Sequence, residues 1–245
     1  MWRTPFLHPF YSFFLLLFVL ACVLVDAGQT KFPVCKFGVL PRKEWRSLTN
    51  DDQQYFLSLL LQVMQRNEQD PHSLSFYDKQ AKMHGDGAGP IHGHPVFLPW
   101  HRYFLVQLEQ EIQSKSVRPI SLPYWKWELD AGRPETAPLW SDDTFGKDGD
   151  VQTDANGRHC VKTGKFANWK PRSNGEHCLS RWFTGNGAGK PHTLGTYFSA
   201  ELTNALLTQN TDYISFEVGW ELAPHGQVHN SIGGDMVSMV QLFFS

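Results

Sequence analysis

The segment from His92 to Glu109 constrains the fold of this chain more than any other part of the sequence. It reads HGHPVFLPWHRYFLVQLE, so His92 and His101 flank the point where a loop enters a helix. Apolar residues then recur at helical spacing on the same stripe as His101, namely Phe104, Leu105, Leu108 and Ile112. The pattern predicts a helix from about Pro99 to Ser114 that turns His101 toward a core.

The rest of the chain is predicted to be mainly helical, with long irregular connections. Capping residues and apolar spacing predict further helices over residues 49–66, 71–83 and 196–207, and one that begins near Pro224. Gly, Asn, Asp and Pro dominate residues 130–191. A loop region of that length is predicted to be a partly ordered surface insertion.

The N-terminus has the features of a secretory signal. Arg3 precedes an apolar run from Phe13 to Val25. The residues Val25-Asp26-Ala27, before Gly28, are typical of a cleavage site with small residues. We therefore expect residues 1–27 to be a signal peptide, residues 28–245 to be one domain, and the mature protein to be secreted. An uncleaved signal anchor is the alternative, although the run is shorter than the ~20 residues of a spanning helix.

The cysteines agree with export. The sequence has 4 cysteines, of which Cys22 lies in the signal segment. Cys160 and Cys178 lie in the irregular region, where a covalent link removes loop entropy, so we predict that they form a disulfide. Cys35 is then without a predicted partner.

Composition and charge exclude several partners. A formal net charge of -2 gives no reason to expect nucleic acid, and aromatic residues at 14% are sufficient for a packed core. No segment after the signal is apolar enough to span a membrane, so no membrane partner is expected once the signal is removed. The sequence does not indicate an oligomeric state.

Five histidines have apolar helical surroundings that suit metal ligands. Imidazoles without thiolates favour copper, with zinc, iron and nickel as the other metals. Hydrogen-bonded core histidines are the alternative, and His94 could compete with His92 as a ligand. A zinc protease is disfavoured because Gly226 follows His225, where that chemistry needs Glu. The five histidines are His84, His92, His101, His225 and His229.

At these residues the sequence resembles the tyrosinase, catechol oxidase and molluscan haemocyanin family of type 3 binuclear copper proteins. The spacing from His92 through Phe97, Trp100-His101-Arg102 and Leu105 to Glu109 matches the family's first copper signature. The segment LPYWKW at residues 122–127 is similar to a family motif, and PHGQVHNSIGGDM at residues 224–236 resembles the start of the second copper site.

The resemblance implies a four-helix bundle that holds two copper ions, each between three histidines. His84, His92 and His101 would bind the first copper, and His225 and His229 would supply two ligands of the second. The family uses O2 to oxidise phenols and catechols to o-quinones. Phe97, Trp100 and Phe104 would pack around the first site.

The sequence departs from the family pattern at three places. No histidine follows His229, so we expect a truncated domain without the last bundle helix, which would leave Phe104, Leu108 and Ile112 exposed. Gly226 replaces the Asn of many monophenol hydroxylases. Pro90 replaces the Cys that forms a thioether in some relatives.

Two functions remain open at this point. Glu217 matches a family carboxylate that helps to hold a water, and together with Gly226 it favours diphenol oxidation over monophenol hydroxylation. A solvated carboxylate at a helix end is the other interpretation of Glu217. The alternative to an enzyme is an inactive copper binder or a relative that carries oxygen.

Overall fold

The computed structural model describes residues 36–70, 72–184, 192–197 and 199–237. The chain divides into two compact units, Met1–Val34 and Cys35–Ser245, and all described residues belong to the second. The predicted signal peptide and Cys35 lie outside the described residues. The α-helices are α2 (Asn50–Val63), α3 (Phe76–Asp86), α4 (Ala88–Ile91), α5 (Phe97–Lys115), α6 (Ala200–Gln209), α7 (Tyr213–Trp220) and α8 (Gly226–Ile232).

Short helical turns complete the described elements. Five are 3-10 turns, and the sixth, η6, is a π-helical turn that joins α7 to α8. The turns are η1 (Trp45–Ser47), η2 (Trp127–Asp130), η3 (Pro134–Thr136), η4 (Pro138–Trp140), η6 (Glu221–His225) and η7 (Gly234–Met236). Backbone pairing between extended segments in the described residues is limited to isolated bridges. The predicted mainly helical fold is therefore confirmed.

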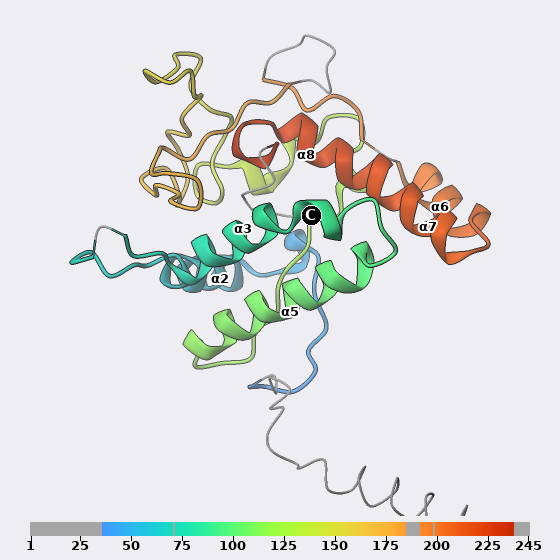
Figure 1. The fold of residues 1–245 in the computed structure, drawn as a ribbon, viewed down its shortest axis with the longest axis horizontal. Helices are drawn as coiled ribbons and strands as arrows, with labels where there is room; N and C mark the ends of the chain where they lie inside the picture. Colours follow the sequence, from blue (N-terminus) through green and yellow to red (C-terminus); the bar gives the residue numbers. More distant parts are fainter. Residues whose placement is uncertain (1–35, 71, 185–191, 198, 238–245) are drawn as a thin grey trace, which may run out of the picture. The chain divides into compact units, whose positions relative to one another are not determined.

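Three helices form the base of the domain. Helix α5 packs against both α2 and α3, while α7, η6 and α8 run as one line of helix above them (Figure 1). This packing covers one face of α5, so Phe104 is only 2% exposed and Ile112 only 1%. Leu108 is partly buried against the same core. The expectation that these three side chains would be exposed is therefore wrong.

Local capping explains most helix starts. Thr49 accepts the Asp52 amide at the start of α2, and Ser75 and Asp78 form a reciprocal capping box at the start of α3. The capping box places the start of α3 later than the predicted residue 71. Ser199 caps α6 in the same way, so this helix also begins later than predicted.

Helix α7 was not predicted from the sequence. Its residues YISFEVGW are mostly apolar on every side, so they have no period that separates a helix from a buried strand. Asp212 caps it through the Ser215 amide. Pro224 therefore lies inside a continuous run of helix rather than at the start of one. Proline has no backbone N–H to donate, and the π turn accommodates this missing hydrogen bond.

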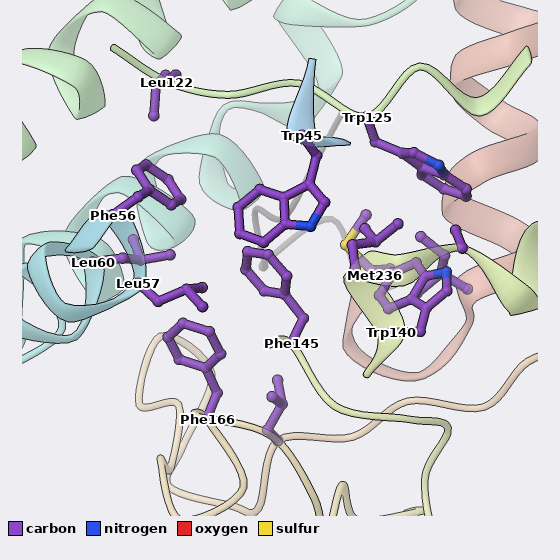
Figure 2. Close-up of a cluster of buried hydrophobic side chains, with 14 of the residues drawn as sticks. Trp45, Phe56, Leu57, Leu60, Leu122, Trp125, Trp140, Phe145, Phe166 and Met236 are labelled. Atoms are coloured by element: carbon purple, nitrogen blue, oxygen red, sulfur yellow. The ribbon is translucent and has the colours of Figure 1, made fainter. Parts of the chain in front are cut away.

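The main core joins the helices to the irregular region. Trp45 lies between Phe56 of α2 and Phe145 of the irregular region, with ring centroids 6.4 and 5.5 Å away, and Phe145 stacks on Phe166 (Figure 2). Phe145 and Phe166 are fully buried. The irregular region is thus an integral part of the core, and the prediction of a surface insertion is wrong.

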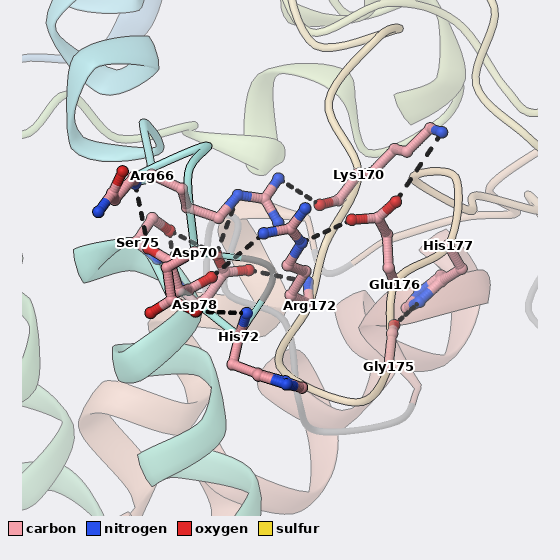
Figure 3. A network of polar contacts seen from close by, with 12 residues as sticks. Arg66, Asp70, His72, Ser75, Asp78, Lys170, Arg172, Gly175, Glu176 and His177 are labelled. Atoms are coloured by element: carbon pink, nitrogen blue, oxygen red, sulfur yellow. Dashed lines mark hydrogen bonds and ion pairs between the residues drawn. The ribbon is translucent and has the colours of Figure 1, made fainter.

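Polar contacts and a disulfide hold the irregular region in place. The amide of Arg172 donates to Asp78 over 2.9 Å, and the Arg66 guanidinium donates to the carbonyl of Lys170 over 2.7 Å (Figure 3). Cys160 and Cys178 form the predicted disulfide. The same network that caps α3 therefore anchors the loop.

Among the described residues, none of the helices combines the length and the apolar composition that crossing a bilayer requires.

Candidate metal centre

Three histidines from three helices meet at the centre of the domain. His84 lies in the last turn of α3, His92 directly follows α4, and His101 lies in the second turn of α5. One nitrogen from each ring lies within 4.8 Å of the other two. His84 is only 1% exposed, and His92 and His101 are partly buried. Its geometry suits a single metal ion.

Backbone carbonyls orient two of these rings. His92 Nδ1 donates to the Ala88 carbonyl over 3.0 Å, and His101 Nδ1 donates to the Phe97 carbonyl over 2.8 Å. Both acceptors lie four residues earlier, in the preceding helical turn. Because a carbonyl can only accept, each Nδ1 carries the proton and each Nε2 keeps its lone pair.

The remaining nitrogens face one another. His84 Nε2 and His101 Nε2 are 3.1 Å apart. His92 Nε2 is buried and has no hydrogen-bond partner in the described part of the chain. A buried nitrogen without a partner costs free energy, and coordination to a metal removes that cost. The donor set therefore fits a metal that prefers imidazole, such as copper.

A second pair of imidazoles adjoins this triad. His225 ends η6 and His229 lies in α8, with ring centroids 4.5 Å apart. His225 stacks on His92 at 5.7 Å. Its Nδ1 donates to the Glu221 carbonyl, and its buried Nε2 has no hydrogen-bond partner among the described residues. Among those residues, no third side chain joins His225 and His229 to make a group of three ligand atoms.

Burial favours the neutral form of three of these imidazoles. Burial first, and the neighbouring histidines as well, lower the pKa of His101 to about 4 and that of His225 to about 3. Burial also lowers the pKa of His229. Neutral imidazole is the form that binds a metal, so these nitrogens are available as ligands at neutral pH.

Aromatic side chains enclose the triad as predicted. Phe104 stacks on His84 at 5.7 Å, Trp100 lies 5.9 Å from the same ring, and Phe97 lies 4.4 Å from His101. A cavity of about 640 Å³ reaches His101 and His225, and Trp127 and Trp220 contribute to its walls. Its volume can accommodate a small aromatic molecule beside both histidines.

The two glutamates of this region have separate roles. Glu217 is 1% exposed, so the interpretation of a solvated helix-end carboxylate is wrong. Burial raises its pKa, and a hydrogen bond and like charge from Glu221 raise it further. Glu221 accepts the Gly93 amide with both oxygens, at 2.7 and 2.9 Å.

Glu221 was not predicted from the sequence. Its side chain accepts the Gly93 amide and its backbone carbonyl accepts from His225 Nδ1, so Glu221 connects the loop of His92 to the turn of His225. The available signal was its position four residues before His225, on the same helical face. His94, the competing candidate, is exposed and lies outside the cluster of three ligand atoms.

Comparison with known proteins agrees with this geometry. Residues 74–241 match the family described as the common central domain of tyrosinase. Tyrosinase ustQ of Aspergillus flavus is 31% identical over 218 residues, which cover 86% of this chain and 60% of that protein. A tyrosinase of Streptomyces galbus is 31% identical over 226 residues, covering 81% of this chain and 74% of that protein.

A solved structure shares the fold. It is the polyphenol oxidase (mutant G292N) of Thermothelomyces thermophila, with a TM-score of 0.58 and 22% identity, covering 85% of this chain and 66% of that chain. The chain spans between 52% and 60% of the length of four tyrosinase-like relatives from Aspergillus flavus and Diaporthe leptostromiformis. Because the family match extends over most of the chain, this protein belongs to the tyrosinase family.

Proposed function

We propose that this protein is a type 3 copper oxidoreductase that oxidises phenols or catechols to o-quinones with O2. His84, His92 and His101 would hold one copper, and His225 and His229 would supply two ligands of a second. The observation that carries the proposal is the cluster of five imidazoles, in which the buried Nε2 atoms of His92 and His225 have no hydrogen-bond partner among the described residues. Membership of the tyrosinase family supports the choice of copper.

Copper, when bound, supplies the electron transfer between the phenol and O2. The protein's own residues prepare the site for it. Carbonyls of Ala88, Phe97 and Glu221 fix three rings through Nδ1, so little reorganisation is needed when the metal enters. Phe97, Trp100 and Phe104 pack against the rings of His84 and His101.

We further propose that diphenols are preferred to monophenols. A monophenol must lose its hydroxyl proton before oxygen insertion, and a carboxylate can accept that proton. Glu217 is buried and is not among the residues that line the cavity beside His101 and His225, so it is not placed to accept that proton directly. Gly226 offers no side chain that could hold a water in its place.

Export is part of the same proposal. A disulfide between Cys160 and Cys178 is typical of an oxidising compartment, and the predicted signal peptide over residues 1–27 would direct the chain there. N-terminal sequencing of the protein from culture medium tests this. A mature N-terminus near Gly28 is expected, whereas retention of the protein inside the cell would contradict export.

The alternative function is a copper protein without oxidase activity, including an oxygen carrier. The observation that favours it is that only His84, His92 and His101 form a complete group of three histidine nitrogens among the described residues. A chain that binds one copper and oxidises no catechol would support this alternative.

Copper titration followed by assays on a catechol and its monophenol tests the main proposal. We expect two coppers per chain, catechol oxidation, and little monophenol hydroxylation. Gly226→Asn is a sharp test of the preference, because an added Cβ would lie 3.4 Å from the Glu221 carbonyl oxygen, an ordinary contact. We expect this substitution to raise the ratio of monophenol to catechol turnover, and an unchanged ratio would contradict the role given to residue 226.

A further inference from the structure

His229 differs from its neighbours in how its ring is held. His92, His101 and His225 each donate from Nδ1 to the carbonyl four residues earlier, within their own helical turn. His229 Nδ1 instead donates over 2.7 Å to the carbonyl of Met236, which follows it in the chain and lies in η7. The orientation of His229 therefore depends on where η7 is placed.

Turn η7 is placed by a segment from the irregular region. We call residues 177–184 the bracing segment. An added Cβ at Gly233 would lie 2.2 Å from the Trp182 carbonyl oxygen, and one at Gly234 would lie 2.4 Å from the Ser180 carbonyl oxygen. Both glycines have positive φ, 64° and 56°. Only glycine permits this backbone approach, so the turn lies directly against the bracing segment.

Asp235 makes the polar connection between the two. Its Oδ2 accepts the Ser180 amide over 2.7 Å, and its Oδ1 accepts from His177 Nε2 over 2.9 Å. The Asp235 amide donates back to the Ser180 carbonyl over 3.0 Å. Asp235 is buried, with 12% of its side chain exposed.

His177 approaches Asp235 as a cation. Its Nδ1 faces the Gly175 carbonyl at 2.6 Å while its Nε2 faces the carboxylate, so both nitrogens donate. The hydrogen bond to Asp235 raises the pKa of His177, which agrees with this geometry. A charge-assisted hydrogen bond is stronger than a neutral one.

The bracing segment is itself fixed to the rest of the domain. The disulfide joins Cys178 to Cys160, and Val161 donates its amide to Leu179 over 2.8 Å. The buried guanidinium of Arg181 donates to three consecutive carbonyls, those of Phe145, Gly146 and Lys147. Movement of the bracing segment would break this set of contacts together.

We propose that Asp235 is a positioning residue for His229. Held by His177 and the Ser180 amide, it places the Met236 carbonyl so that His229 carries its proton on Nδ1 and presents Nε2 to the metal. The disulfide-closed loop is thus the outer support of the second half-site, whereas the first half-site is supported by its own helices. The expected effect on copper binding rests on the proposed function, but the orientation of the His229 ring does not require copper.

The test uses the whole protein labelled with 15N at histidine, observed by NMR without metal and after loading with Cu(I). In wild type we expect His229 to be the Nδ1–H tautomer. Asp235→Ala should give mixed tautomers at His229 and weaken Cu(I) binding at this half-site by about 10- to 100-fold, the usual effect of losing an outer-shell partner. Asp235→Asn keeps an oxygen for the Ser180 amide, so it should lose no more than about threefold, well below that range.

Asp148 provides a matched control. It is an aspartate that accepts the Phe183 and Gly149 amides and pairs with His192, but no hydrogen bond joins it to η7 in the described structure. Asp148→Ala should leave the His229 tautomer unchanged and Cu(I) affinity within about twofold of wild type, far below the outer-shell effect. Equal effects of the two alanine substitutions would indicate general loosening of the loop and would overturn the proposal.

Other outcomes are also decisive. An Nε2–H tautomer in wild type would overturn the proposal even if Asp235→Ala did not fold. An unchanged tautomer and affinity in Asp235→Ala, or a loss in Asp235→Asn as large as in Asp235→Ala, would do the same. Failure of wild type to bind copper, with the His229 tautomer as expected, would contradict the proposed function and leave the ring orientation standing.

Discussion

The two halves of the candidate copper site are supported in different ways. In the first half, His92 and His101 are oriented by carbonyls of the helical turns that precede them, and His84 packs against Phe104 and Trp100. In the second half, His225 follows the same local rule, but His229 depends on a carbonyl in η7. Residues 177–184 hold η7 in place.

The difference separates local from tertiary control of a ligand. A ring fixed by its own helix keeps its orientation wherever that helix is formed. A ring fixed by a carbonyl outside its own helix, as His229 is, keeps its orientation only while the loop around Cys178 is in place. We therefore expect changes to the helices to affect the whole site, and changes to the irregular region to affect mainly the His225–His229 half.

The largest effect is expected from His101→Gln. This substitution removes a proposed ligand rather than a residue that supports one. Loss of a hydrogen-bond partner of a metal ligand lowers activity by up to about 100-fold, so catechol oxidation should fall by more than that. Copper content and catechol turnover are the measurements. The control is His94→Gln, which changes an exposed histidine outside the cluster and should leave both near wild type. A similar loss in both variants would contradict the ligand assignment.

Acid should destabilise the copper-free protein through the clustered histidines. A histidine whose pKa is lowered on folding contributes stability above its unfolded pKa and loses it as the pH falls. For His101 the change from 6.5 to about 4 corresponds to about 3 kcal/mol, lost between these pH values. Urea unfolding at several pH values measures this. His101→Gln should flatten the dependence, and an unchanged slope would contradict it.

Removal of the disulfide should have a comparable but more selective effect. The sequence separation of Cys160 and Cys178 is 18 residues, for which loop entropy predicts about 3 kcal/mol of lost stability when both are changed to Ser. Because Cys178 lies in residues 177–184, copper at the His225–His229 half should weaken more than copper at the first. Equal weakening at both halves would argue against separate supports. Unfolding and stepwise Cu(I) titration distinguish these outcomes.

The smallest effect is expected from His177→Leu, which removes the partner of Asp235. A raised histidine pKa contributes stability below the unfolded value of 6.5, and this contribution is lost as the pH rises through the folded pKa. The variant should therefore lose about 1 kcal/mol at acidic pH, the net value of one hydrogen bond, and almost none at alkaline pH. Equal losses at both pH values would indicate a packing effect instead. Urea unfolding provides the measurement.

The sequence predicted the first half-site more fully than the second. The helix of His101 follows from spacing and turn residues, which are local, whereas His84 and His92 were predicted as ligands from the family resemblance. Helix α7 was missed because its apolar residues lack a period, and Glu221 was missed because its partner, the Gly93 amide, is distant in the chain. Glu217 could not be placed for the same reason, since its burial depends on neighbouring elements.

The irregular region shows the limit most clearly. Its many Gly, Asn and Asp residues predicted a surface insertion, but Phe145 and Phe166 are buried against Trp45 and α2. The amino-acid composition of a segment indicates its average backbone preference. Whether the segment is buried depends on which of its aromatic side chains pack against other elements of the core.

The amino-acid sequence alone established the family, the mainly helical fold, the Cys160–Cys178 pair and the five histidines that we propose as ligands. These features are encoded by residue types and by their spacing within several separate segments of the chain. The tertiary structure alone decided that Glu217 is buried beside Glu221, that α5 is covered, and that His229 is held through Asp235 and Met236. The burial of Glu217, the covering of α5 and the support of Asp235 by Ser180 depend on segments far apart in the chain, and no local pattern encodes them.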